Sequence, residues 1–182
     1  VASGLSKRDL IRLLARMNGK YLVSLTELQV EGLTLVAYNR HHPSWLYRIE
    51  EVAPRAYVVP QAHYEAEPKQ TIIELATQEF DPTQVVLLDE PVDLPETRDF
   101  FAAVRILSYE NQQVSLLAVL NAPAVLVLTD AFAPGWKAYV NGSERRVQRA
   151  NYFFRAVVLP AGRSRICFRY EPDSLRRGII VT

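Results

Sequence analysis

The stretch that decides the fold of this chain is residues 124–172, AVLVLTDAFAPGWKAYVNGSERRVQRANYFFRAVVLPAGRSRICFRYEP. It consists of short apolar runs separated by turn residues, which is the pattern of consecutive β-strands. Asn141-Gly142 is the pair that a two-residue type I′ hairpin favours, because both central residues need a positive φ. Pro160-Ala161-Gly162 suits another tight reversal. The stretch therefore predicts antiparallel strands joined by tight turns.

Similar apolar runs precede this stretch, so the strand pattern extends over the whole C-terminal half. Seven short strands at this spacing are typical of a β-sandwich or jelly roll. Residues 96–182 are therefore predicted to form an antiparallel β-sandwich or jelly-roll domain. The expected strands cover residues 102–109, 113–120, 124–129, 136–140, 145–149, 152–159 and 163–170.

The N-terminal half mixes helix and strand patterns. Ser6 is a candidate N-cap for a helix over residues 7–17, with Asp9 at the third helical position, and Pro68 suits the first turn of a helix over residues 68–78. The prolines and acids of residues 89–99 favour an extended connection. The predicted fold class is α+β, with a mixed α+β subdomain over residues 1–95. Its expected strands cover residues 20–25, 33–39, 45–50, 56–60 and 85–88.

Charge and composition exclude several classes of function. The 21 basic and 20 acidic residues leave a formal net charge of +1, which provides no field to attract a phosphate backbone, so no nucleic-acid partner is expected. The single cysteine, Cys167, excludes an intramolecular disulfide and fits an ordinary strand position. The histidines have no cysteine or acid at ligand spacing, so neither a metal nor a cofactor is expected.

Whether the chain contains a membrane-spanning or signal segment is judged from its apolar stretches and from its two ends. No stretch approaches the roughly 20 apolar residues that span a bilayer, and the N-terminus lacks a signal-peptide pattern, so a soluble segment is expected. Residues 175–182 turn apolar where the chain stops. This pattern fits a terminal strand or the approach to a membrane helix beyond the C-terminus equally well.

Several ordered fragments of the chain resemble one family. The C-terminal half resembles the last extracytoplasmic region of the YfhO family of bacterial polytopic membrane proteins, and the N-terminal half matches its leucine-rich helix and Phe-Asp-Pro segment. The chain departs from the family pattern at Ala53, where Leu is usual, and at Ser164, where a Gly-x-His is common. The fragments are Leu13-Leu14, Asn18, Lys20 to Val23, Pro54-Arg55-Ala56, Phe80-Asp81-Pro82, Pro134 to Tyr139, Asn141-Gly142, Asn151-Tyr152, Phe154-Arg155-Ala156, Pro160-Ala161-Gly162 and Tyr170-Glu171-Pro172.

The resemblance implies a membrane-bound glycosyltransferase of the glycosyltransferase C superfamily that uses a polyprenyl-phosphate sugar donor. In such enzymes the catalytic acid is expected in an early loop between membrane helices, which this chain does not include. The chain is then a non-catalytic region on the extracytoplasmic side of the cell membrane. Its expected partners are an envelope glycan or a polyprenyl-phosphate sugar, and its own transmembrane region.

Candidate ligand-binding residues come from the residue types that sugar sites combine, aromatic platforms and planar polar groups. The alternative is structural: Trp136 belongs to the core, while Asn151 and Arg155 cap turns or pair with carboxylates such as Asp130. Arg55 is a candidate for a phosphate contact or for an interdomain ion pair. The candidate carbohydrate-binding residues are Asp130, Trp136, Tyr139, Asn151, Tyr152 and Arg155.

Three functions remain open from the sequence. The first is recognition or positioning of an envelope glycan for the transferase. The second is a protein–protein or scaffold module that packs on a membrane core without binding sugar. The third, a self-contained hydrolase, lacks an evident pair of carboxyl groups, since Asp130 has only Glu144 as a candidate partner.

Overall fold

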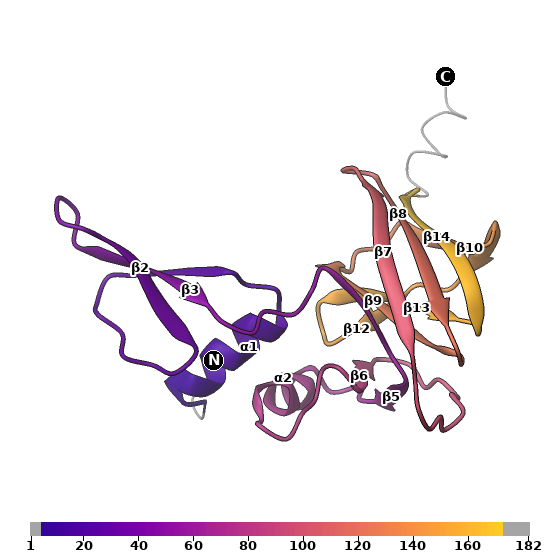
Figure 1. Ribbon diagram of the computed structural model, residues 1–182, viewed down its shortest axis with the longest axis horizontal. Coiled ribbons are helices and arrows are strands. Elements are labelled where there is room, and N and C mark those ends of the chain that lie inside the picture. Colours follow the sequence, from indigo (N-terminus) through magenta and orange to yellow (C-terminus); the bar gives the residue numbers. More distant parts are fainter. Residues whose placement is uncertain (1–4, 173–182) are drawn as a thin grey trace. The chain divides into compact units, whose positions relative to one another are not determined.

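The computed structural model describes residues 5–172, and it is mostly β (Figure 1). The chain contacts divide these residues into two compact units. Unit 1 comprises residues 5–55 and 67–82, and unit 2 comprises residues 56–66 and 83–172. Residues 175–182, for which the sequence left a strand or an approach to a membrane helix open, lie outside the described residues.

Unit 1 contains the two helices of the described residues, α1 (Lys7–Arg16) and α2 (Pro68–Ala76). The predicted cap of α1 forms: the Ser6 hydroxyl accepts from the Asp9 amide, and the Asp9 carboxylate accepts from the Ser6 amide at 3.1 Å. This reciprocal arrangement satisfies two backbone donors at the start of the helix. Pro68 occupies the first turn of α2, as expected, because its missing N–H has no partner there anyway.

A three-stranded antiparallel sheet completes unit 1. Its strands are β1 (Tyr21–Ser24), β2 (Leu33–Asn39) and β3 (Ser44–Ile49), in the order β1-β3-β2. One end of this sheet packs on α1 through a small core in which Ile11 and Ala15 meet Ile49. The β2–β3 hairpin is the long twisted ribbon that runs away from α1 in Figure 1.

Unit 2 consists of two sheets. The first has five strands in the order β11-β10-β14-β8-β7, all antiparallel. The second has six strands in the order β4-β9-β13-β12-β6-β5, in which only the β5–β6 pair is parallel. The strands of the first are β7 (Ala102–Tyr109), β8 (Gln113–Leu120), β10 (Trp136–Val140), β11 (Ser143–Arg145) and β14 (Gly162–Tyr170). Those of the second are β4 (Ala56–Val59), β5 (Gln61–Tyr64), β6 (Val85–Leu88), β9 (Ala124–Ala131), β12 (Gln148–Ala150) and β13 (Phe154–Leu159).

The two sheets share one hydrophobic core, so unit 2 is a β-sandwich. Alternate residues of β8 and β14, such as Leu116 and Phe168, are fully buried and pack with Leu126 of β9 and Leu159 of β13. This alternation is what a strand with one face on a core and one in solvent requires. The predicted sandwich is therefore confirmed for this part of the chain.

The turns follow the sequence expectation. Asn141 and Gly142 both have positive φ, 52° and 84°, and join β10 to β11. The Asn141 side chain also accepts from the Arg165 amide at 2.8 Å, which ties the turn to β14. Gly135 has φ 95°, and a Cβ there would lie 3.0 Å from Pro172, so the Pro134-Gly135-Trp136 segment requires glycine for space as well as for conformation.

The grouping of strands differs from the boundary expected near residue 95. β4, β5 and β6 belong by sequence to the first half, but they complete the six-stranded sheet of unit 2, where β4 pairs with β9 and β6 with β12. Each is only four residues long, and strands this short are stable only as part of a larger sheet. The β4–β5 segment therefore leaves unit 1 and the chain returns to it for α2.

The shared core predicts a large difference between two leucine-to-alanine variants on adjacent strands. Leu116 is fully buried, whereas Leu107 is 42% exposed. Leu116→Ala should lower the free energy of unfolding by about 2–5 kcal/mol, because it removes buried methyl groups and leaves a cavity. Leu107→Ala should cost less than about 1 kcal/mol. Urea denaturation measures both, and equal losses would contradict the assignment of Leu116 to the core.

Candidate functional site

A buried ion pair joins Arg155 of β13 to Asp130 of β9. The Arg155 Nη2 donates to Asp130 Oδ2 at 2.7 Å, and the two side chains are 3% and 9% exposed. The β9–β13 register shifts here, since Phe154 pairs with Ala131 but Arg155 with Leu128. Bulges of this kind turn a side chain away from its regular direction and are common beside functional sites. The irregular register is therefore what presents Asp130 to Arg155.

Trp136 of β10 covers the guanidinium from the opposite sheet. The Cζ of Arg155 lies 3.6 Å from the centre of the Trp136 ring, and the Tyr170 ring lies 5.4 Å from Trp136. A guanidinium over an indole is attracted by the negative face of the ring. Arg155 thus connects the two sheets, with a carboxylate in its own sheet and an aromatic ring in the other.

Burial has a clear electrostatic effect on this cluster. Desolvation lowers the pKa of Arg155, and the Asp130 carboxylate opposes that shift. The guanidinium stays charged, because an arginine does not deprotonate in proteins. Its Nε and Nη1 are buried and have no hydrogen-bond acceptor among the described residues. Two nitrogen atoms of a charged, buried group therefore lack a hydrogen bond beside the ion pair.

A hollow of about 310 Å³ opens beside this cluster. Asp130, Trp136 and Arg155 line it together with the end of the β7–β8 hairpin. The Tyr109 hydroxyl donates to Asp130 Oδ1 at 2.8 Å, so the hairpin end is bonded to the ion pair. The hollow combines aromatic walls with carboxylate, amide and guanidinium groups. The hairpin contributes Tyr109, Glu110 and Asn111, which sequence reasoning missed.

Asn151 has a structural role inside unit 2. It is buried at a positive φ of 48°, in the turn between β12 and β13. Its Oδ1 accepts from the Leu87 amide at 2.9 Å, and its Nδ2 donates to the Tyr57 hydroxyl at 3.2 Å. Desolvation raises the pKa of that hydroxyl. The geometry corresponds to the turn-capping alternative that the sequence left open for this residue.

Tyr139 and Tyr152 line other surfaces than the hollow. Tyr139 borders a groove of about 400 Å³ with Arg165 and Arg169, and its hydroxyl donates to Glu171 at 3.0 Å. That bond is the main cause of the raised pKa of Tyr139 and of the lowered pKa of Glu171. Tyr152 packs edge-on against Phe153. The six candidates therefore do not form one cluster.

Arg55 is exposed at the end of the first segment of unit 1. Its phosphate contact or interdomain ion pair stays a prediction. Cys167 is partly buried on β14. Among residues 5–172 no group of three or more His, Cys, Asp or Glu side chains is placed to hold a metal ion.

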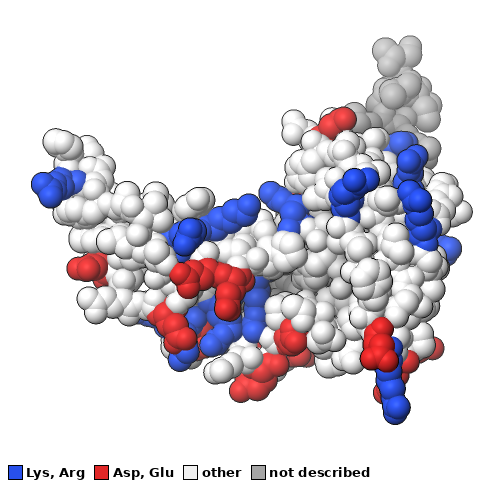
Figure 2. Space-filling view, in the orientation of Figure 1, with Lys and Arg blue, Asp and Glu red and all other residues white. Residues whose placement is uncertain are grey.

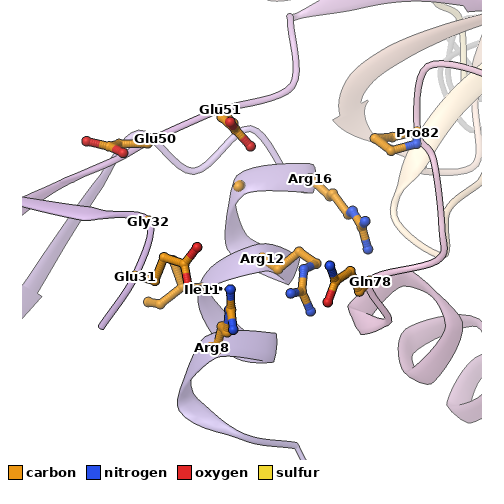
Figure 3. A pocket seen from close by; sticks show the side chains of 11 residues that line it. Arg8, Ile11, Arg12, Arg16, Glu31, Gly32, Glu50, Glu51, Gln78 and Pro82 are labelled. Atoms are coloured by element: carbon orange, nitrogen blue, oxygen red, sulfur yellow. Dashed lines mark ion pairs between the residues drawn. The ribbon is translucent and has the colours of Figure 1, made fainter. Parts of the chain in front are cut away.

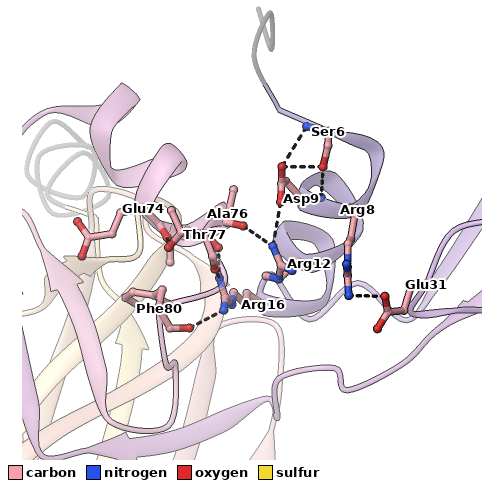
Figure 4. Close-up of polar contacts among 11 residues, drawn as sticks. Ser6, Arg8, Asp9, Arg12, Arg16, Glu31, Glu74, Ala76, Thr77 and Phe80 are labelled. Atoms are coloured by element: carbon pink, nitrogen blue, oxygen red, sulfur yellow. Dashed lines mark hydrogen bonds and ion pairs between the residues drawn. The ribbon is translucent and has the colours of Figure 1, made fainter.

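The arginines of unit 1 line a second pocket, of about 380 Å³ (Figure 3). Arg8, Arg12 and Arg16 follow each other at helical spacing along α1. Arg12 donates to the Ala76 carbonyl at 2.9 Å, and Arg16 donates to the Leu75 carbonyl at 2.5 Å, to the Thr77 carbonyl at 2.7 Å and to that of Phe80 (Figure 4).

These contacts explain the arginines without a ligand. The last carbonyls of a helix have no partner within it and attract cations. Arg12 and Arg16 supply that charge at the end of α2, while Arg8 pairs with Glu31. Burial lowers the pKa of Arg16. Because Glu31, Glu50 and Glu51 also line the pocket, it is not a strongly cationic site.

The fold and the hollow define a β-rich protein region in which a sandwich carries a small polar and aromatic site. Residues 17–182 match the family model described as bacterial membrane protein YfhO. The chain therefore belongs to the YfhO family of bacterial membrane proteins, as its sequence fragments indicated. No curated protein and no solved structure matches the chain. Within residues 5–172 no helix has the length and apolar character to cross a membrane.

Loss of the buried ion pair should lower the stability of the protein. Asp130→Ala leaves the Arg155 charge uncompensated, so the free energy of unfolding should fall by about 3–5 kcal/mol. Asp89→Ala is the matched control, since Asp89 faces Arg149 at 3.8 Å with both side chains about 40% exposed. It should cost less than about 1 kcal/mol. Chemical denaturation compares the two, and a small loss in Asp130→Ala would show that Arg155 is solvated.

Proposed function

We propose that this chain is an extracytoplasmic, non-catalytic region of a membrane-bound glycosyltransferase that uses a polyprenyl-phosphate sugar donor. In this proposal the hollow around Arg155 recognises or positions an envelope glycan for the transferase. Membership in a bacterial membrane protein family supports the membrane association. The donor and the transfer reaction come from the family resemblance, and the glycan-binding role comes from the site.

The observation that carries the glycan proposal is the composition of the hollow. Sugar rings present hydroxyl groups that bond to planar polar side chains, and apolar faces that stack on aromatic rings. The hollow offers the carboxylate of Asp130, the amide of Asn111 and the rings of Tyr109 and Trp136. The charge of Arg155, which also lines the hollow, suits an acidic substituent.

The same geometry argues for binding rather than catalysis. Glycosidic chemistry needs one carboxyl group to act as an acid and a second to act as base or nucleophile. Asp130 accepts from Arg155 through Oδ2 and from Tyr109 through Oδ1, so both of its oxygens already hold a hydrogen bond. Its interactions position the carboxylate as a hydrogen-bond acceptor.

A scaffold function is the second candidate, and Asn151 favours it. The Oδ1 and Nδ2 atoms of Asn151 both form hydrogen bonds within unit 2. This is a structural role for a residue that was a candidate for sugar contact. In that case the region packs on a membrane core or another envelope protein without contacting sugar. The two candidates differ in whether the hollow responds to glycans.

A two-dimensional amide NMR titration of the 182-residue chain with a panel of envelope sugars and a short polyprenyl-phosphate sugar analogue tests the proposal. Saturable shifts should appear on residues 109–111, 130 and 136. Asn111→Ala should weaken binding about fivefold or more, because one hydrogen bond to a hydroxyl contributes about 1 kcal/mol. Asn111 is exposed, so its replacement should leave the fold intact.

Gln112→Ala is the control, since this exposed amide is next to Asn111 but does not line the hollow. It should bind as the unchanged protein does. No response to any sugar would favour the scaffold function. Equally weakened sugar binding in both variants would exclude the hollow as the binding site.

A further inference from the structure

The β2–β3 hairpin of unit 1 has an unusual charge pattern. Residues 33–49 contain no Asp or Glu, although the chain as a whole carries 20 acidic residues. The same segment carries Arg40 and Arg48, together with His41 and His42. Figure 2 shows basic side chains at the far end of this hairpin, with mostly uncharged surface next to them. The tip of the hairpin therefore carries the charge of Arg40, and no acidic side chain of the hairpin compensates it.

The same small sheet exposes large apolar side chains. Tyr38 of β2 is 46% exposed, and Leu35 and Val36 about half exposed. On β1, Tyr21 and Val23 are 63% and 65% exposed. A single exposed apolar side chain needs no explanation, but several in one small sheet indicate an interaction surface. The α1 core covers only the base of the sheet, through residues such as Leu22, Leu33 and Ile49.

The tip of the hairpin is held in a defined conformation. Tyr38 and Trp45 pair across the strands with ring centres 4.8 Å apart, directly next to the turn. The Asn39 side chain accepts from the amides of His41 and His42 at 3.0 and 3.3 Å, and Ser44 donates to the His42 carbonyl. The Arg40 charge and two aromatic rings are thus presented together at the end of one hairpin.

A cation beside paired Tyr and Trp rings matches the chemistry of a bilayer surface. Tyr and Trp favour the boundary between headgroups and acyl chains, and basic side chains are attracted to anionic headgroups. Since the family is one of bacterial membrane proteins, a bilayer is a neighbour of the molecule. We propose that the β2–β3 hairpin docks on the anionic headgroup surface of a membrane, with Arg40 at the lipid phosphates and Tyr38 and Trp45 at the interface.

Vesicle sedimentation of the 182-residue chain tests this proposal independently of any glycan. The protein should sediment with vesicles that mix phosphatidylcholine and phosphatidylglycerol at low salt, and should remain in solution with phosphatidylcholine alone. High salt should release it, because exposed charges are screened. Arg40→Glu should weaken the binding about tenfold or more, since it removes one cation and adds a repelled charge.

Arg105→Glu is the matched control, because Arg105 is also exposed but lies on β7 of unit 2. It should bind the mixed vesicles within about threefold of the unchanged protein, the spread expected of a remote surface charge. In a Trp136→Phe background Trp45 is the only tryptophan, and its fluorescence should shift to shorter wavelength when the mixed vesicles are added.

Three outcomes would overturn the proposal. They are failure to bind the mixed vesicles, equal binding to both vesicle types, and equal losses in Arg40→Glu and Arg105→Glu. If the exposed apolar side chains of this sheet pack on a protein and not on lipid, the chain should fail to bind the mixed vesicles. Circular dichroism of each variant verifies that the fold is retained, and the unchanged protein alone decides the first two outcomes.

Discussion

The ion pair between Arg155 and Asp130 is the interaction on which the site in unit 2 depends. Removing two charges from water is costly, and their mutual attraction offsets this only in good geometry. Here the irregular register of β9 and β13 supplies the carboxylate, and Trp136 supplies the ring that covers the cation. Asp130, Trp136 and Arg155 all line the hollow. Its polar character follows from the ion pair and from Tyr109, which donates to Asp130.

Much of the fold could be predicted from local patterns. The Ser6 cap, the Asn141-Gly142 turn and the alternation of β8 and β14 are encoded in adjacent residues, and the structure has all three. Sheet membership could not be predicted in the same way. β4 and β6 find their partners far along the chain, so neither periodicity nor turn chemistry assigns them to the sandwich.

The candidate site was predicted only in part, because local patterns do not show which residues distant in sequence come together. Asp130, Trp136 and Arg155 stood out by residue type and do line one hollow. Tyr109 and Asn111 did not, because only the packing of the two sheets brings the β7–β8 turn to Asp130, and a Tyr at a strand end carries no local signal. Asn151 was selected as a polar residue beside aromatics, but its positive φ and its bonds to Leu87 and Tyr57 give it a role in the fold. Whether it also contacts a ligand remains a prediction.

The most direct test of the central claim is sugar transfer in membrane vesicles that contain the full-length membrane protein. Labelled sugar should pass from a polyprenyl-phosphate donor to an envelope acceptor, and Asn111→Ala should raise the KM for the acceptor with little change in kcat, while Gln112→Ala behaves as the unchanged protein. That split is expected because a binding residue distant from the chemistry contributes equally to the ground state and the transition state. No transfer above vesicles that lack the protein would contradict a role in a glycosyltransferase.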